Sequence, residues 1–205
     1  MASTNTTLVD KSISVVVSCV PIAIAIILGY YSSVLSKQSR QIDVNSSVPR
    51  FNMSSSSKES KGTGPMSIFY NNINKPRYAP PPIVFSIVWP ILYVSLAIAT
   101  FLATFWTGSC RALTIYVVLF INLIFNVAYP YAQFVKGDMA ASMVVVWGAL
   151  VTATLFVFAV SYNRSSCTDM FSALFATPYV LWLCFASVLS VDIYILNPKK
   201  NGVVK

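Results

Sequence analysis

The chain contains the stretch Lys75-Pro-Arg-Tyr-Ala-Pro-Pro-Pro-Ile-Val-Phe-Ser-Ile-Val-Trp-Pro-Ile-Leu-Tyr93, in which a basic, proline-rich segment leads directly into a long apolar segment. Proline is favoured at the start of a helix because its missing N–H would have no partner there and its φ angle is already helical. Pro80–Pro82 therefore predict a helix start. Trp89 and Tyr93 then lie on one helix face, most simply as core packing, with ligand contact as the alternative. Pro90 predicts a kink beside Trp89.

The composition is that of a membrane protein. Of 205 residues, 56% are hydrophobic and 10% are charged, whereas roughly a quarter of the residues of a soluble domain are charged. A membrane-spanning helix needs roughly 20 consecutive apolar residues. We therefore predict an all-α membrane protein, a bundle of five transmembrane helices. The predicted spans, all free of Lys and Arg, are Ile13 to Leu35, Ile83 to Trp106, Leu113 to Phe134, Met139 to Tyr162 and Phe171 to Leu196.

These spans divide the chain into five parts. The loop after the first span is rich in serine and charged residues, a composition that cannot bury enough apolar surface to order itself. We expect a short non-cytosolic tail (1–12), a first transmembrane helix (13–36), a flexible polar insertion in the first cytosolic loop (37–65), a lid segment with helices two to five (66–197) and a basic cytosolic tail (198–205).

The Lys and Arg residues predict the orientation. With five spans, three of the 14 fall on the side of the N-terminus and eleven on the opposite side. Because positive charge collects on the cytosolic side, the N-terminus is expected outside the cytosol and the C-terminus inside it. The net charge of +8 then faces anionic lipid headgroups, so membrane lipids are expected partners and nucleic acid is not. The organelle stays open between the mitochondrial outer membrane and a secretory-pathway membrane.

The third predicted span carries a polar stripe. Asn122, Asn126, Tyr129 and Gln133 recur at intervals of four, three and four residues. Carboxamides in hydrocarbon need partners, so the stripe must face other helices or a cavity. Hydrogen bonds between helices and contacts with a ligand are equally good explanations.

The fifth span repeats the aromatic-then-small pattern, with Trp182 and Ala186 one turn apart on one face. Leu189, Tyr194 and Lys199 also match a loose pattern proposed for cholesterol contact, which is a weak signal by itself. Small residues on helix faces, as at Ala99 in the second span, allow close helix approach and a homodimer.

Several chemistries are excluded by what the chain lacks. It has no His, so the usual haem axial ligand, imidazole metal sites and His-based triads are excluded. Its acids and four cysteines have no metal-ligand spacing, so we expect no metal site, no catalytic residues and no required cofactor. A bound porphyrin would have to be held by stacking and hydrogen bonds. Cys110 and Cys167 fall in two loops on the non-cytosolic side, so a disulfide between them is topologically allowed.

Three sequence blocks form one pattern. They are Lys75-Pro-x-Tyr-x-Pro-Pro81 with Val84-Phe85, Trp89 and Leu92-Tyr93; Asn122-Leu-Ile-Phe-Asn126; and Pro178-Tyr-x-x-Trp-x-x-Phe-Ala-x-x-Leu189 with Asn197. In order and spacing, these blocks together resemble the TspO/MBR family of translocator and tryptophan-rich sensory proteins. The chain departs from the family's pattern at Phe69, Tyr78 and Phe125, where members usually have Trp, and at Pro90.

The resemblance implies a five-helix bundle whose ligand pocket opens toward the cytosol under the first loop. Members bind porphyrins and haem, and animal members also bind cholesterol and benzodiazepine-type compounds. The polar stripe adds Tyr129 to the candidate ligand-binding residues. The positions that match the family's pocket are Tyr70, Trp89, Tyr93, Asn122, Asn126, Trp182 and Ala186.

Three functions remain as hypotheses. The first is a membrane binding protein for porphyrin or haem-type tetrapyrroles, acting as a sensor, scavenger or transport partner. This hypothesis rests on two tryptophans on separate helices with carboxamides between them, an arrangement that suits a planar amphipathic ligand. The second, by analogy with bacterial relatives, is light-dependent porphyrin degradation using Trp89 and Trp182. The third is cholesterol or lipid binding.

Overall fold

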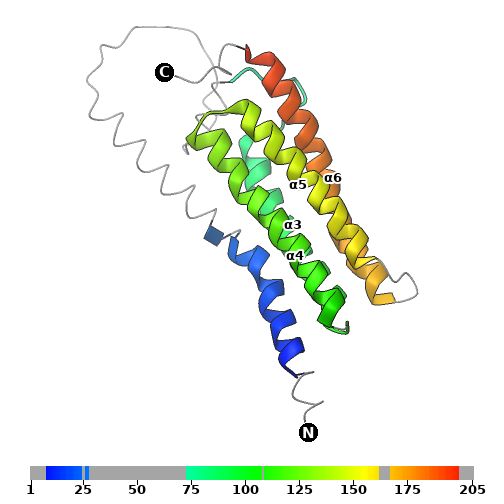
Figure 1. Cartoon of the computed structure of the whole chain (residues 1–205). Coiled ribbons are helices and arrows are strands. Elements are labelled where there is room, and N and C mark those ends of the chain that lie inside the picture. Colours follow the sequence, from blue (N-terminus) through cyan, green and yellow to red (C-terminus); the bar gives the residue numbers. More distant parts are fainter. Residues whose placement is uncertain (1–7, 25, 28–72, 108, 162–166, 199–205) are drawn as a thin grey trace, which may run out of the picture.

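The computed structural model describes residues 8–24, 26–27, 73–107, 109–161 and 167–198, and within these residues it contains helices and no strand (Figure 1). Residues 8–24 are helical. The later elements are α3 (Pro82–Thr104), α4 (Ser109–Pro130), the π-helix η1 (Tyr131–Val135), α5 (Met139–Val160) and α6 (Cys167–Leu196).

Four of these helical segments are long and apolar enough to cross a membrane: 82–104, 110–133, 139–160 and 167–196. The last four spans predicted from the sequence match them, with every boundary within four residues. The chain is therefore a helical membrane bundle. The first predicted span, 13–35, lies only partly in the described residues, and its helix begins earlier than predicted, by residue 8.

The proline-rich stretch begins α3 as predicted. Pro81 is the N-cap residue in extended conformation (φ −64°, ψ 153°), and Pro82 is the first helical residue. Proline at this place leaves no hydrogen bond unmade, because the first N–H groups of a helix have no partner inside it. The helix continues through Pro90 to Thr104.

The end of α4 changes its helical geometry. After Pro130 the backbone becomes a π-helix, in which the Lys136 N–H donates to the Tyr131 carbonyl at 3.1 Å. Gly137 then takes φ +64°, a conformation that costs a glycine little. Asp138 begins α5 by accepting a hydrogen bond from the Ala141 N–H at 2.9 Å. These features make a tight turn that returns the chain into the bundle.

The helices pack side by side, with the most extensive contacts between α4 and α5, between α5 and α6, and between α3 and α6 (Figure 1). Small residues occupy these interfaces, among them Ala99, Ala149 and Ala176, which are buried. Gly148 on α5 meets the Phe125 ring of α4, and a Cβ at this glycine would lie 2.6 Å from the ring. Close approach of helix backbones is how membrane helices gain packing energy.

The helix of residues 8–24 packs beside the C-terminal end of α3. The Ser14 and Thr104 hydroxyls are 2.6 Å apart, and both side chains are buried. The Lys11 ammonium lies 5.3 Å from the Phe105 ring and 5.0 Å from the Trp106 ring, which are cation–π distances. Residue 11 and residues 104–106 therefore lie at the same end of the bundle.

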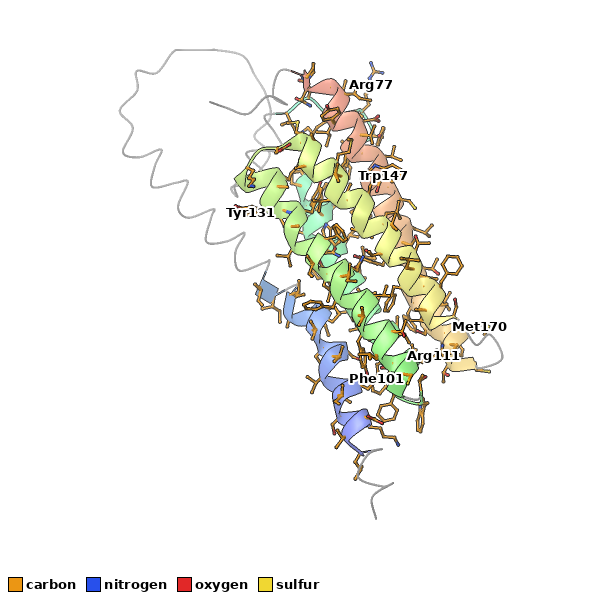
Figure 2. The ribbon with its side chains drawn as sticks, in the orientation of Figure 1. Arg77, Phe101, Arg111, Tyr131, Trp147 and Met170 are labelled. Atoms are coloured by element: carbon orange, nitrogen blue, oxygen red, sulfur yellow. The ribbon has the colours of Figure 1, made fainter. Side chains whose placement is uncertain are left out.

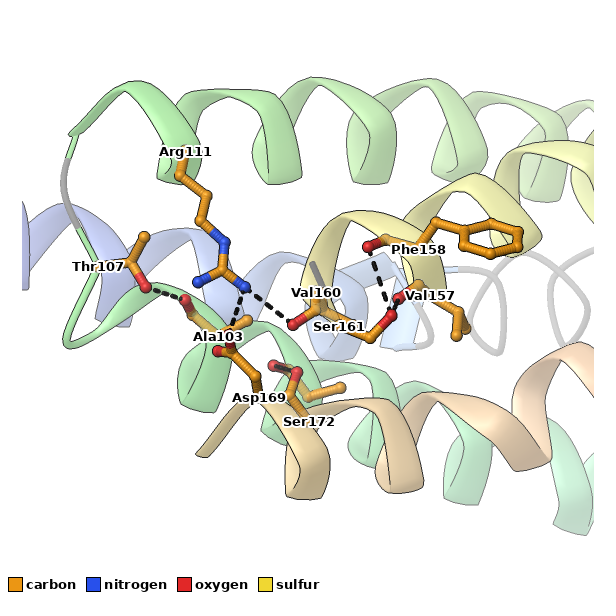
Figure 3. Close-up of polar contacts among 10 residues, drawn as sticks. Ala103, Thr107, Arg111, Val157, Phe158, Val160, Ser161, Asp169 and Ser172 are labelled. Carbon is orange, nitrogen blue, oxygen red and sulfur yellow. Dashed lines mark hydrogen bonds and ion pairs between the residues drawn. The ribbon is translucent and has the colours of Figure 1, made fainter. Parts of the chain in front are cut away.

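At this end an ion pair joins three helices (Figure 3). The Arg111 Nη2 of α4 donates to the Asp169 carboxylate of α6 at 2.8 Å and to the Val160 carbonyl of α5 at 3.0 Å. Cys110 and Cys167, next to these two charged residues, are both free cysteines. The disulfide that the topology allowed is therefore not formed. Lying at the same end of the bundle is not enough for two cysteines to form a disulfide.

Large apolar side chains cover the outside of the bundle, as expected for a surface in contact with lipid. Trp147 on α5 is 47% exposed, and Figure 2 shows its place on that helix. Trp106, beyond α3, is 69% exposed. In the same figure Arg77 and Arg111 lie at opposite ends of the bundle.

Candidate functional site

Five aromatic side chains of α3 and α6, which we call the aromatic site, gather in the half of the bundle nearer to Arg77. The Trp89 and Tyr93 rings of α3 are stacked, with centroids 5.7 Å apart and planes 28° apart. The Phe85 ring, one turn before Trp89, meets Trp182 of α6 edge to face at 5.7 Å. Trp182 also packs against Phe185 at 5.4 Å. The predicted residues Trp89, Tyr93 and Trp182 thus belong to two aromatic pairs, Trp89 with Tyr93 on α3 and Trp182 of α6 with Phe85 of α3.

Among the residues that the structure describes, the indole N–H of Trp182 has no hydrogen-bond partner, although the nitrogen is buried. An unmet buried donor costs free energy, so such groups are rare in folded proteins. Phe85 and Phe185, which surround this indole, offer only ring carbons. Trp182 therefore holds an unused donor inside the aromatic site.

Directly beneath the aromatic site, four polar side chains form a buried network. The Tyr93 hydroxyl donates to Asn126 Oδ1 at 3.4 Å, and Asn126 Nδ2 donates to the Tyr179 hydroxyl at 2.6 Å. The Tyr179 hydroxyl in turn donates to Asn122 Oδ1 at 2.7 Å. All four side chains are buried. The network therefore connects α3, α4 and α6 through their side chains alone.

Asn122 extends this network to α5. Its Nδ2 donates to the Ala149 carbonyl at 2.8 Å and to the Thr152 hydroxyl at 2.9 Å. Both of its amide hydrogens and its carbonyl oxygen are thus engaged by protein. In this structure Asn122 and Asn126 of the stripe make hydrogen bonds between helices, the first of the two explanations open from the sequence. Ligand contact by Asn122 and Asn126 stays a prediction.

Tyr179 is the member of this network that sequence reasoning missed. It stands in the motif Pro178-Tyr179, but it lies three residues before Trp182 and so falls outside the four-residue spacing of Trp182 and Ala186. A tyrosine in the middle of an apolar span could have identified it, because a buried phenol needs a hydrogen-bond partner.

The other predicted residues lie near the same half of the bundle. Ala186 is buried in the main core, against which Trp89 and Trp182 pack. The Tyr129 hydroxyl lies beside the side chain of Ser190. Tyr70 lies outside the described residues, so its place in the site stays a prediction.

Residues 73–81, the described part of the lid segment, cover the end of the bundle next to the aromatic site. Ile73 is buried in a small apolar cluster with Met139, Leu189 and Ile193. Phe85 and Phe185 of the aromatic site pack against this cluster. The lid segment is therefore continuous with the aromatic site through apolar contacts.

Two sets of hydrogen bonds fasten the lid segment to the end of α6. The Asn74 N–H donates to Asn197 Oδ1 at 3.0 Å, and Asn197 Nδ2 donates back to the Asn74 carbonyl at 2.9 Å. The Tyr78 hydroxyl donates to the Asp192 carboxylate. This hydrogen bond raises the pKa of Tyr78, with smaller contributions from burial and from the negative charge of Asp192. Partial burial lowers the pKa of Lys75 in the same segment.

One residue of the predicted sterol surface is buried in the structure. Leu189 is only 4% exposed and lies in the cluster beneath the lid segment, with Tyr194 packed against that cluster. In this structure Leu189 is not open to a sterol in the lipid phase, and sterol contact at Tyr194 and Lys199 stays a prediction. Lys199, the third residue of the pattern, lies outside the described residues.

Comparison with known proteins agrees with the sequence motifs. The family model described as the TspO/MBR family matches residues 47–196. The chain belongs to this family. This TspO/MBR chain is 31% identical over 132 residues to the uncharacterized membrane protein YtaB of Bacillus subtilis, a match that covers 63% of the chain and 80% of YtaB.

Two further relatives of this TspO/MBR chain carry descriptive names. The tryptophan-rich protein TspO of Chlorobaculum tepidum is 32% identical over 139 residues, covering 65% of the chain and 82% of the relative. The tryptophan-rich sensory protein of Cereibacter sphaeroides is 30% identical over 132 residues, covering 63% and 77%. The resemblance inferred from the motifs is thereby confirmed.

Proposed function

We propose that this TspO/MBR protein binds porphyrin or haem-type tetrapyrroles in the membrane and acts as a sensor, scavenger or transport partner. The ligand would lie against Trp89 and Trp182, beneath the lid segment. The observation that carries the proposal is the presence of two aromatic pairs on the packed helices α3 and α6, Trp89 with Tyr93 and Phe85 with Trp182, with an unused indole donor in the second pair. Relatives named tryptophan-rich sensory protein agree with a sensing role.

The chemistry of the aromatic site suits this ligand class. A tetrapyrrole is a flat, largely apolar ring system, and aromatic side chains contribute large flat surfaces for stacking. Apart from Arg111 and Asp169 at one end and Asp192 near the other, α3 to α6 carry no charged residue. The macrocycle would therefore lie among apolar groups, and its charged substituents would point toward the lid segment.

We further propose that the helix beginning at residue 8 crosses the membrane as the first of five spans. Its Lys11 end lies beside Trp106 at the C-terminal end of α3, so the two helices would run in opposite directions through the bilayer. The excess of Lys and Arg on the opposite side supports a non-cytosolic N-terminus and a cytosolic C-terminus. Under this topology the lid segment and the aromatic site face the cytosol.

The chain's four tryptophans allow a matched experiment. Purified full-length protein is titrated with protoporphyrin IX, and binding is followed by the porphyrin's Soret absorbance. The double variant Trp89→Phe/Trp182→Phe removes the two indoles of the site. The control, Trp106→Phe/Trp147→Phe, removes two exposed ones.

We expect at least about tenfold weaker binding for the first variant, because each buried aromatic contact contributes on the order of 1 kcal/mol. The control should bind like the wild type. Equal affinity in both variants would place the ligand elsewhere, and no saturable binding by the wild type would refute the proposed function.

A further inference from the structure

The unused donor of Trp182 restricts which ligand the aromatic site can accept. The Nε1 atom is buried and has no hydrogen-bond partner in the described part of the chain. In contrast, the polar side chains one layer below, Asn122, Asn126 and Tyr179, satisfy one another. A ligand that supplies an acceptor to Trp182 removes the penalty of the unmet donor, whereas one without an acceptor leaves the penalty in place.

The acceptor should be electrically neutral. Trp182 stands near the middle of α6, 13 residues after Asp169 and 10 before Asp192, the nearest charged residues on that helix. At 1.5 Å per residue, both lie roughly 15 to 20 Å away along the axis. The facing helix α3 has no charged residue at all. A carboxylate placed at Trp182 would lose its hydration without gaining a counter-charge, which is strongly unfavourable.

The position of the acceptor on the ligand follows from the shape of a tetrapyrrole. Its pyrrole nitrogens point to the centre of the macrocycle, so a donor that meets the edge of the ring system cannot reach them. The indole N–H points outward in the plane of its own ring, so a ligand that accepts from Nε1 must bring an acceptor on its own periphery to that atom. Among neutral substituents at that edge, a carbonyl group accepts a hydrogen bond without bringing a donor that would itself need a partner.

We propose that Trp182 Nε1 is a specificity-determining donor that selects tetrapyrroles carrying a neutral carbonyl on the ring periphery. This inference rests on the proposed function and narrows its ligand class. Propionate groups on the same ligand point away from Trp182, toward the end of the bundle where Lys75 and Arg77 lie.

Two synthetic porphyrins isolate the effect of the carbonyl. Mesoporphyrin carries two ethyl groups where diacetyldeuteroporphyrin carries two acetyl groups, and both have the same two propionates. Dissociation constants for both are measured by Soret titration with the wild type, with Trp182→Phe and with the control Trp147→Phe, which removes an exposed indole. Wild type and control should bind the diacetyl compound about tenfold more tightly than mesoporphyrin. Trp182→Phe should bind the two within about twofold of each other.

An infrared measurement supports the test without depending on how the variant folds. In the wild-type complex the acetyl C=O stretch should move to lower frequency than in an apolar solvent, as a hydrogen-bonded carbonyl does. Equal affinities in the wild type, a preference that survives in Trp182→Phe, or an unshifted carbonyl band would overturn the inference. If neither porphyrin binds the wild type, the proposed function fails, and the inference fails with it.

Discussion

Tyr179 is the residue through which the buried network can be tested most cleanly. Its hydroxyl donates to Asn122 at 2.7 Å and accepts from Asn126 at 2.6 Å. The change Tyr179→Phe removes only this oxygen and keeps the ring that fills the core. It breaks both bonds and leaves Asn122 Oδ1 with one donor fewer.

The expected loss of stability follows from these two bonds. Interhelical hydrogen bonds in membranes contribute roughly 0.6 kcal/mol on average and up to about 1.7 kcal/mol. We therefore expect Tyr179→Phe to lower the free energy of unfolding by about 1 to 3 kcal/mol. For a chain of this length, such a change corresponds to a decrease in Tm of roughly 2 to 12 °C.

Thermal unfolding in detergent, followed by circular dichroism, measures this change. Tyr131→Phe is the control, because this ring is 54% exposed and its contact with the Lys136 ammonium needs the ring and not the hydroxyl. The control should melt within about 1 °C of the wild type. A Tyr179→Phe variant as stable as wild type, or a control equally destabilised, would show that the network does not hold the helices together.

Three other substitutions test separate contacts. Gly148→Ala should cost about 1 to 3 kcal/mol of stability, since its Cβ would lie 2.6 Å from the Phe125 ring, and adding Phe125→Leu should restore most of the loss in the same melts. Asp169→Asn should cost about 2 kcal/mol by leaving its guanidinium partner without a counter-charge, and a melt that does not change with this variant would contradict the ion pair. The hydrogen bond to Asp192 raises the pKa of Tyr78 above its ordinary 10.0. This hydrogen bond therefore stabilises the folded protein fully below pH 10, and the stabilisation disappears as the pH rises through the raised pKa of Tyr78 in the folded state. In the Asp192→Asn variant, Tyr78 should ionise at a lower pH than in the wild type. The measurement is a pH titration of phenolate absorbance, in which the signal of the other tyrosines is removed by subtracting the titration of the same protein carrying Tyr78→Phe.

The membrane helices could be predicted closely because hydropathy is a local property of the sequence. Apolar runs without Lys or Arg located α3, α5 and α6, and the proline cluster located the start of α3. The π-helix after Pro130 was not predicted. Whether a helix end winds as α or π depends on how the turn packs against its neighbours, which no short sequence pattern encodes.

The candidate site was predictable only where it depends on spacing within one helix. The Trp89–Tyr93 stack follows from two aromatics four residues apart. The partners of the asparagine stripe did not follow, because the bond from Asn126 to Tyr179 depends on the rotation of α6 against α4. Rotational register between helices results from packing over their whole length.

Helical geometry explains why Leu189 does not lie on a lipid-facing surface with Tyr194. Leu189 and Tyr194 are five residues apart, which is about 140° around a helix at 3.6 residues per turn. The two side chains therefore cannot share one lipid-facing surface. Leu189 is buried in the apolar cluster that it forms with Ile73, Met139 and Ile193. A linear pattern without helical periodicity does not describe a surface.

The most direct test of tetrapyrrole binding at the aromatic site is a fluorine NMR spectrum of protein labelled with 5-fluorotryptophan. The chain has four tryptophans, so four resonances are expected, and single Trp→Phe variants assign them. A porphyrin's ring current falls steeply with distance. On adding protoporphyrin IX, the resonances of Trp89 and Trp182 should move strongly, while those of Trp106 and Trp147 should stay near their free positions. Large shifts at the two exposed tryptophans, with Trp89 and Trp182 unmoved, would contradict the account.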